Sequence, residues 1–203
     1  MGLSIHYRGS LLNKASLPAL VEEVKDIAII HQWPFEVYDC EFPLYRFGRK
    51  KYSNTLYGIR FTPPECETVS LCFLSNGRLV SFYSWLLYIK SLGKDHSWLQ
   101  GAASVKTQYA GENVHKMVIH LLDHVSKKYF RHFALMDEGQ YWETRDENLL
   151  HQNFAVLNGL IKSVGTVMQE NPIQNSEPFE KYFERLLQEM HSRKNKGISK
   201  NPC

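Results

Sequence analysis

The chain has 203 residues, of which 43% are hydrophobic, so it is long enough to bury a full core as one domain or as two packed halves. Its formal net charge of +3 is small and lacks the positive excess expected of a dedicated nucleic-acid-binding protein.

The cysteines and the apolar segments indicate a compartment. Cys40, Cys66, Cys72 and Cys203 form no CxxC pair and no zinc-binding spacing with histidine. The N-terminal residues contain no long apolar segment of the secretory type. No apolar run approaches the ~20 residues of a membrane span. We therefore expect a cytoplasmic protein with reduced thiols and no membrane partner.

The first elements along the chain are a strand, a helix and a second strand. Residues 3–8 alternate polar and apolar side chains, which predicts a strand. An apolar stripe at helical spacing predicts a helix with Ser16 as its N-cap, and this helix ends before Pro34. Residues 35–39 predict the second strand.

A loop over 41–54 precedes three further predicted strands. These strands cover residues 56–61, 68–74 and 79–87. The last two are joined through Asn76-Gly77, and both of these residues tolerate positive φ angles, so the pair is a strong signal for a β-hairpin.

The pattern of the first elements then begins again. Residues 105–111 echo residues 3–9, and a second helix is predicted over about 113–129. Residues 133–137 match 35–39 in type and spacing. The repeated order predicts an internal duplication of a β-α-β unit. Chance similarity is the alternative, because few residues are identical.

Two helices and a tail complete the chain. The first helix carries an apolar stripe from Leu149 to Val164, and Gly165 just beyond it is the predicted stop. The second begins at Ser176 and buries apolar residues as far as Met190. The basic tail over 191–203 has few apolar residues and is predicted to be flexible.

Together these elements predict an α+β fold. A mixed, mostly antiparallel sheet combines the two related β-α-β units, with helices on one face and the two C-terminal helices beyond them. The predicted units cover residues 1–92 and 102–190, packed as one globular domain and followed by the tail. If another strand lies between the two strands of a unit, the unit resembles half of a split β-α-β arrangement.

Acidic residues at strand ends are the candidates for catalysis. Asp137, Glu138 and Glu143 follow a predicted strand, and Asp39 occupies the corresponding position in the first unit. Clustered carboxylates could bind a divalent cation or perform acid–base chemistry. These four residues would then form a catalytic site.

The same stretch also has a structural interpretation. Residues 137–140 fit a tight turn. Thr144 and Glu147 fit a capping box, in which each side chain satisfies a backbone N–H group at the start of a helix. Both interpretations remain open on the sequence alone.

His120 and His124 are the candidate metal ligands, because residues four apart share one face of a helix. Both lie off the apolar stripe of the predicted helix. A third ligand is not evident, and the glutamate of an H-E-x-x-H site is absent. We expect solvent-facing histidines and no metal.

Large aromatic residues near strand ends are the candidates for contacting a small ligand. They would line a cleft between the two halves, or they would simply cap the core. These residues are Tyr7, Tyr38, Tyr109, Tyr141 and Trp142.

The loop over 41–54 is the candidate for binding an anion. Arg46, Arg49, Lys50 and Lys51 alternate there with aromatic residues. Such cations neutralise phosphate, and aromatic rings stack on bases, so a nucleic acid is one partner to consider. A solvated basic loop is the alternative.

Sequence motifs for catalysis are missing. The chain has no nucleophile elbow, no phosphate-binding loop and no dinucleotide fingerprint. The sequence therefore favours a non-catalytic binding domain without a cofactor, whose partner is a small molecule, another protein or a second copy of the chain in a homodimer. The alternative is a metal-dependent hydrolase or nuclease that uses the acids at the strand ends.

Overall fold

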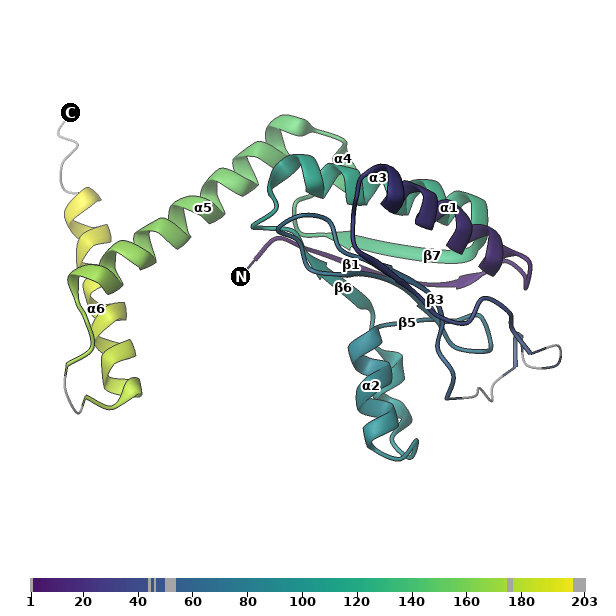
Figure 1. Cartoon of the computed structure of the whole chain (residues 1–203). Helices are drawn as coiled ribbons and strands as arrows, with labels where there is room; N and C mark the ends of the chain where they lie inside the picture. Colours follow the sequence, from purple (N-terminus) through teal and green to yellow (C-terminus); the bar gives the residue numbers. More distant parts are fainter. Residues whose placement is uncertain (1, 44, 46, 50–53, 175–176, 199–203) are drawn as a thin grey trace. The chain divides into compact units, whose positions relative to one another are not determined.

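The computed structural model describes residues 2–43, 45, 47–49, 54–174 and 177–198 (Figure 1). The chain divides into two compact units, Met1–Phe154 and Ala155–Cys203. Residues 1–92, the first predicted unit, therefore lie in the same compact unit as residues 102–154 of the second predicted unit.

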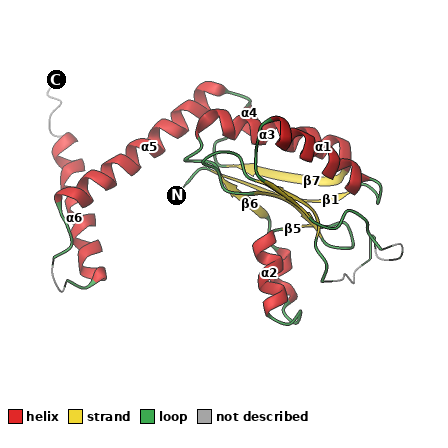
Figure 2. Cartoon of the chain, in the orientation of Figure 1, coloured by secondary structure: helices red, strands yellow, loops and turns green. Residues whose placement is uncertain are grey.

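The described strands form two antiparallel sheets (Figure 2). One sheet has the strand order β6-β1-β7 and the other has the order β2-β3-β4-β5. The strands are β1 (Ser4–Leu11), β2 (Phe35–Val37), β3 (Tyr57–Phe61), β4 (Val69–Phe73), β5 (Leu79–Val80), β6 (Ala103–Lys106) and β7 (Phe130–Asp137).

The two sheets lie edge to edge. Ser10 of β1 forms an antiparallel bridge with Arg78, and the next residue of β1 donates a backbone hydrogen bond to the carbonyl of Gly77. The hydroxyl of Tyr7 on β1 reaches the backbone of Ser70 on β4. The strands therefore follow one another in a single series, with β2 at one edge and β7 at the other.

Helices lie on both sides of these strands. Figure 1 shows α1 and α3 on one side and α2 on the other. The helices are α1 (Ser16–Ile30), α2 (Phe82–Lys90), α3 (Gly111–Tyr129), α4 (Tyr141–Thr144), α5 (Glu147–Glu170) and α6 (Phe179–Ile198), and η1 (His96–Gln100) is a 3-10 helix. Helices were expected on one face only, so the position of α2 corrects that prediction.

The main core lies between the strands and the helices α1 and α3. Ile5 and Tyr7 alternate with more exposed residues along β1, and Ile59 of β3 is fully buried beside them. Leu17 and Leu20 of α1 are also fully buried. Each such aliphatic side chain contributes about 1.5–3 kcal/mol to folding.

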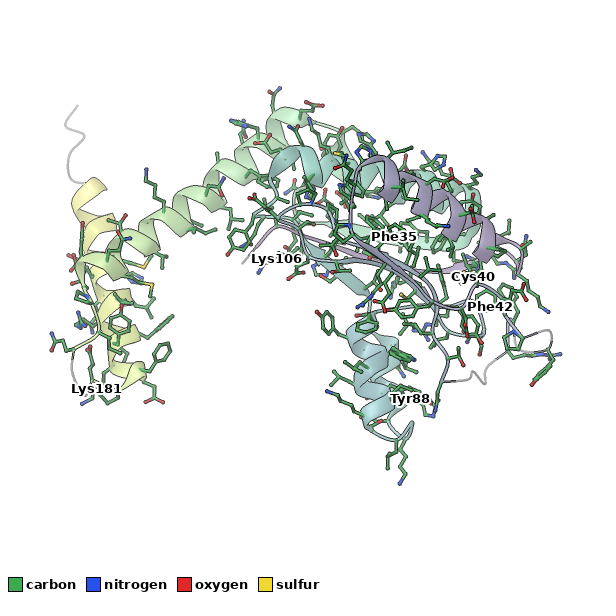
Figure 3. All side chains as sticks on the ribbon, in the orientation of Figure 1. Phe35, Cys40, Phe42, Tyr88, Lys106 and Lys181 are labelled. Carbon is green, nitrogen blue, oxygen red and sulfur yellow. The ribbon has the colours of Figure 1, made fainter. Side chains whose placement is uncertain are left out.

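A smaller cluster lies under α2 on the opposite face. Cys72 of β4 and Val80 of β5 contact Tyr88 of α2 and Leu99 of η1. Figure 3 labels Tyr88 on this helix. The cluster attaches α2 to part of this face and leaves the rest of it uncovered.

The second compact unit contains the end of α5 and the whole of α6. Val167 of α5 is buried against Tyr182 and Leu186 of α6, and Met190 packs on them. The two C-terminal helices predicted from the sequence are therefore confirmed.

The predicted α+β class is confirmed, and so is one split β-α-β arrangement. β6 and β7 both run antiparallel to β1, which lies between them, and α3 connects them. The first unit is arranged differently, because β2 pairs with β3 in the other sheet. The structure therefore does not show an internal duplication.

The strand predicted over 79–87 is wrong beyond its first residues. Gly77 does form a turn with φ +83°, and β5 pairs with β4 as a hairpin. However, β5 ends at Val80, and α2 begins at Phe82. A short apolar run does not distinguish a strand from a buried helix. Here the aromatic side chains pack better on one face of a helix.

Two predicted helix caps are replaced by neighbouring residues. Ser16 is already helical, and its N–H donates to the side chain of Asn13. The capping box of Thr144 and Glu147 is also wrong. The carboxylate of Asp146 instead accepts from the N–H groups of residues 148 and 149. In both cases a short polar side chain that precedes the helix accepts hydrogen bonds from the free N–H groups of the first turn.

The C-terminal helices are longer than predicted. α5 continues through Gly165 to Glu170, because a glycine weakens a helix without necessarily ending it. α6 continues to Ile198, past the start of the predicted tail at residue 191. The predicted helix start at Ser176 lies outside the described residues.

A transmembrane helix is not found in the described part of the chain, where each helix is too short or too polar to cross a bilayer. The described cysteines Cys40, Cys66 and Cys72 are free thiols.

The close approach of β3 and β4 makes Gly58 sensitive to substitution. Gly58 has φ +114°, and a Cβ atom there would lie 2.2 Å from the carbonyl oxygen of Leu71. We expect Gly58→Ala to lower the free energy of unfolding by at least about 2 kcal/mol, which urea denaturation would measure. Gly159→Ala is the control, since open space surrounds that helical glycine. The control should be neutral or stabilising by up to about 1 kcal/mol. Equal urea midpoints for the two variants would contradict this account of β3.

Candidate functional site

Polar side chains gather on the sheet face opposite α1 and α3, here called the open face. On β3, Arg60 lies between the buried Ile59 and Phe61, and on β4, Ser70 precedes the buried Leu71. Adjacent side chains in a strand point to opposite faces, so Arg60 and Ser70 face away from the main core. The two residues are paired across the strands and therefore lie side by side.

Arg60 and Ser70 line a cavity of about 510 Å³, here called the Arg60 pocket. Its size is typical of small-molecule sites. Its other walls come from the chain before β4, from the start of α2 and from β6 with the residue before it. These lining residues are Cys66, Glu67, Thr68, Ser81, Phe82, Tyr83, Ala102 and Ser104.

Arg60 is held in place from two directions. Its Nη2 atom forms an ion pair with Glu36, the residue opposite it on β2. Its guanidinium lies 3.6 Å from the centre of the Phe82 ring and 5.6 Å from that of Tyr38. The hydrogen bond from Arg60 holds the pKa of Glu36 below its usual range. The cation is therefore fixed at the edge of the pocket before any ligand arrives.

Two hydrogen-bonding groups of the pocket residues are buried without a nitrogen or oxygen partner in the described part of the chain. They are Nε of Arg60 and Oγ of Ser70, and the weakly bonding thiol of Cys72 lies beside the Ser70 hydroxyl. A buried group of this kind costs about 1–3 kcal/mol unless a water or ligand atom pairs with it. Both groups can donate a hydrogen to an oxygen atom, and both belong to residues that line the pocket.

The start of α2 adds further donors. Ser81 precedes the helix in an extended conformation, and its side chain makes no capping hydrogen bond. The first turn contains no acidic residue. The free N–H groups of a first helical turn carry partial positive charge and attract anions. Since Ser81, Phe82 and Tyr83 line the pocket, this positive end lies at its wall.

The thiol of the pocket is held in its protonated form. Burial raises the pKa of Cys66 to about 12, and its Sγ donates to the carbonyl of Lys106. The thiolate form is therefore nearly absent at neutral pH. No histidine is among the described residues that line the pocket, and its acidic residue, Glu67, accepts a hydrogen bond from the N–H of Lys106.

Asp137, the leading acidic candidate, lies in a buried hydrogen-bond network. Its carboxylate accepts from the N–H groups of Gly139, Tyr141 and Trp142. The Nε2 atom of His115 lies 3.1 Å from one carboxylate oxygen and 3.2 Å from the other. These contacts confirm the turn that the sequence suggested as a structural role.

The network extends from His115 to Thr107. The hydroxyl of Thr107 lies 2.7 Å from Nδ1 of His115 and also donates to the carbonyl of Leu3. The side chains of His115 and Asp137 have no solvent exposure. Burial alone would raise the pKa of Asp137, but His115 and the backbone donors lower it. These groups join α3 to β7 and the start of α4 and are closed to a substrate.

The other acidic candidates do not converge with Asp137 on a metal site. Glu138 accepts from the N–H of Ser4, and Glu143 lies 3.4 Å from the N–H of Asp137. Asp39 is exposed after β2, at the opposite edge of the strand series. Among the described residues, no group of three metal-ligating side chains exists.

The aromatic candidates do not share one cleft. Tyr7 and Tyr141 are buried, and Tyr109 is 67% exposed. Trp142 packs near Phe133. Tyr38 alone among the five lies beside the Arg60 pocket, where it stacks on Phe82.

The histidine and loop candidates are accounted for separately. His120 and His124 are exposed and bind different partners, the hydroxyl of Tyr141 and the carboxylate of Glu23. Arg49 is exposed. Arg46, Lys50 and Lys51 lie outside the described residues, so the predicted anion site in the loop stays a prediction.

Sequence reasoning missed Arg60, Ser70 and His115. Arg60 could have been noticed as the single charged residue in an apolar strand, and His115 as a polar residue on the apolar stripe of its helix. Ser70 gives no such signal.

No family model matches the chain, and no curated protein or solved structure matches it significantly. The function is therefore inferred from the geometry of the site.

The network around Asp137 makes stability depend on pH. The folded protein holds the pKa of Asp137 below its unfolded value near 3.8. The carboxylate therefore stabilises the fold above that pH, and the stabilisation is lost as pH falls through the lower folded pKa. We expect Asp137→Asn to lower the free energy of unfolding at pH 7 by about 2–4 kcal/mol and to flatten its decline in acid.

Urea denaturation between about pH 7 and pH 2 measures this difference. Glu143→Gln is the control, because its exposed carboxylate makes only one long contact with Asp137. A wild-type-like acid profile for Asp137→Asn would show that the network does not stabilise the charged form of Asp137.

Proposed function

We propose that this chain is a non-catalytic binding domain for a small molecule that carries a carboxylate or phosphate group, held in the Arg60 pocket. The observation that carries this proposal is the pair of buried donors without a nitrogen or oxygen partner, Nε of Arg60 and Oγ of Ser70, on two residues that line one cavity. An anionic oxygen placed between them would satisfy both groups.

The hydrogen-bond donors of the pocket favour an anion over a neutral ligand. Hydrogen bonds to charged groups are about twice as strong as those between neutral groups. Arg60 uses Nη2 for Glu36, and its Nε–H group has no partner among the described residues. The positive end of α2 adds to the attraction of a negative group. The rings of Phe82 and Tyr83 supply apolar surface for the remainder of the molecule.

Binding is favoured over catalysis because the pocket holds donors but no activated group. The Cys66 thiol is protonated at neutral pH, since its pKa is about 12. Glu67 also lines the pocket, and its carboxylate accepts from the N–H of Lys106. The alternative of a metal-dependent hydrolase draws no support from the described carboxylates, which do not form a group of three.

Inorganic phosphate is the simplest probe of this proposal. We expect phosphate to raise the melting temperature of the full chain, because a ligand that binds only the folded state stabilises it. We expect Arg60→Gln to weaken phosphate binding at least roughly tenfold, since it removes a charged donor worth about 1.5–3 kcal/mol. Isothermal titration calorimetry measures the dissociation constants.

Two further variants test whether the anion binds in the pocket itself. Ser70→Ala should weaken binding, yet it should leave stability unchanged or raise it by about 1 kcal/mol, because it removes an unpaired buried hydroxyl. Arg49→Gln should leave binding unchanged, since Arg49 is exposed in the loop and does not line the pocket. A loss of binding in Arg49→Gln but not in Arg60→Gln would place the anion site in the loop instead.

A further inference from the structure

A second cavity lies on the open face next to the Arg60 pocket. Its volume is about 330 Å³, and its lining includes Arg8, Ser10, Arg78 and His132. Arg8 and Ser10 alternate along β1 with the buried Tyr7, which places them on the open face. We call this cavity the Arg8–Arg78 groove.

Strand register brings the cationic groups of the groove together. Ser10 pairs with His132 of β7 on one side and bridges Arg78 on the other. Arg8 lies two residues from Ser10 on the same face of β1. Three cationic or protonatable side chains from neighbouring segments therefore surround one hydroxyl group.

The arginines of the groove are available to a ligand. Arg8, Arg78 and His132 are all exposed, and the described lining of the groove contains no acidic residue. Scattered surface arginines usually face solvent singly. Here two of them share a concave site with a hydroxyl group. Arginine binds phosphate through paired N–H donors, so a phosphate-like group is the chemistry that this site suits.

The groove and the Arg60 pocket are separated by two short segments. Gly101 lines the groove, whereas Ala102 and Ser104 of the same segment line the pocket. At the end of β5, Leu79 lines the groove and Ser81 lines the pocket. A spacing of one to three residues in extended chain corresponds to roughly 3–10 Å.

We infer that the Arg8–Arg78 groove is a second anion subsite and that the ligand is a molecule with two anionic groups, one in each cavity. This inference rests on the proposed function of the Arg60 pocket and specifies its ligand class. A linker of suitable length lets the second group bind at high effective concentration, so the whole molecule binds more tightly than either anionic group alone.

Bisphosphonates of different length test this inference on the full chain. Calorimetry would compare methylphosphonate, ethane-bisphosphonate and hexane-bisphosphonate. We expect the longest probe to bind at least roughly tenfold more tightly than methylphosphonate, because only its two groups can occupy both cavities. The double variant Arg8→Gln/Arg78→Gln should abolish this advantage of length and leave inorganic phosphate binding unchanged.

The double variant Lys90→Gln/Lys94→Gln is the matched control, because it removes the same charge from exposed positions that do not line either cavity. It should keep the advantage of length. If phosphate binds through Arg60 but affinity does not depend on probe length, the second subsite is refuted and the proposed function stands. If none of the probes binds, the proposed function fails as well.

Discussion

The arrangement of the strands depends on one buried hydroxyl group. Tyr7 of β1 donates to the carbonyl of Ser70 and accepts from its N–H, at 3.0 and 2.9 Å. Ser70 pairs with Arg60 on its other side, so these two backbone groups face the gap between the sheets. Without Tyr7 they would be buried and unpaired, which is costly for a backbone group. Burial raises the pKa of Tyr7 well above its usual range, so the hydroxyl keeps its proton and donates.

Ser70 connects this contact between the two sheets to the candidate site. The backbone of Ser70 is held at the join, while its side chain projects into the Arg60 pocket on the open face. Arg60 is equally constrained, since Glu36 binds one edge of its guanidinium and Phe82 covers one face. The Arg60 side chain, which carries one of the unpaired donors, is therefore held in place by its neighbours. Preorganised donors of this kind bind an anion without first losing conformational freedom.

Periodicity in the sequence predicts the helices α1 and α3 and the α+β class. Apolar residues at helical spacing lie on one face of a helix, and that face packs against the core. Periodicity does not distinguish α2 from a strand, because apolar residues after Val80 occur at both helical and strand spacing. Packing against the buried cluster that contains Cys72 selects the helix. The candidate site was less accessible to prediction. Arg60 and Ser70 meet through strand pairing, and sequence spacing does not reveal which strands are neighbours.

The contrast between Asp137 and Arg60 explains why we place the proposed site in the Arg60 pocket and not in the acid-rich stretch. Asp137 is surrounded by donors, and each of its oxygens is already bonded to backbone or to His115. A group whose hydrogen-bonding capacity is satisfied within the fold has little left to offer a ligand. Arg60 and Ser70 line a cavity and retain unpaired donors, and these donors lower the stability of the folded chain. Buried polar groups without partners, rather than clusters of charge, are therefore the stronger indication of binding in this chain.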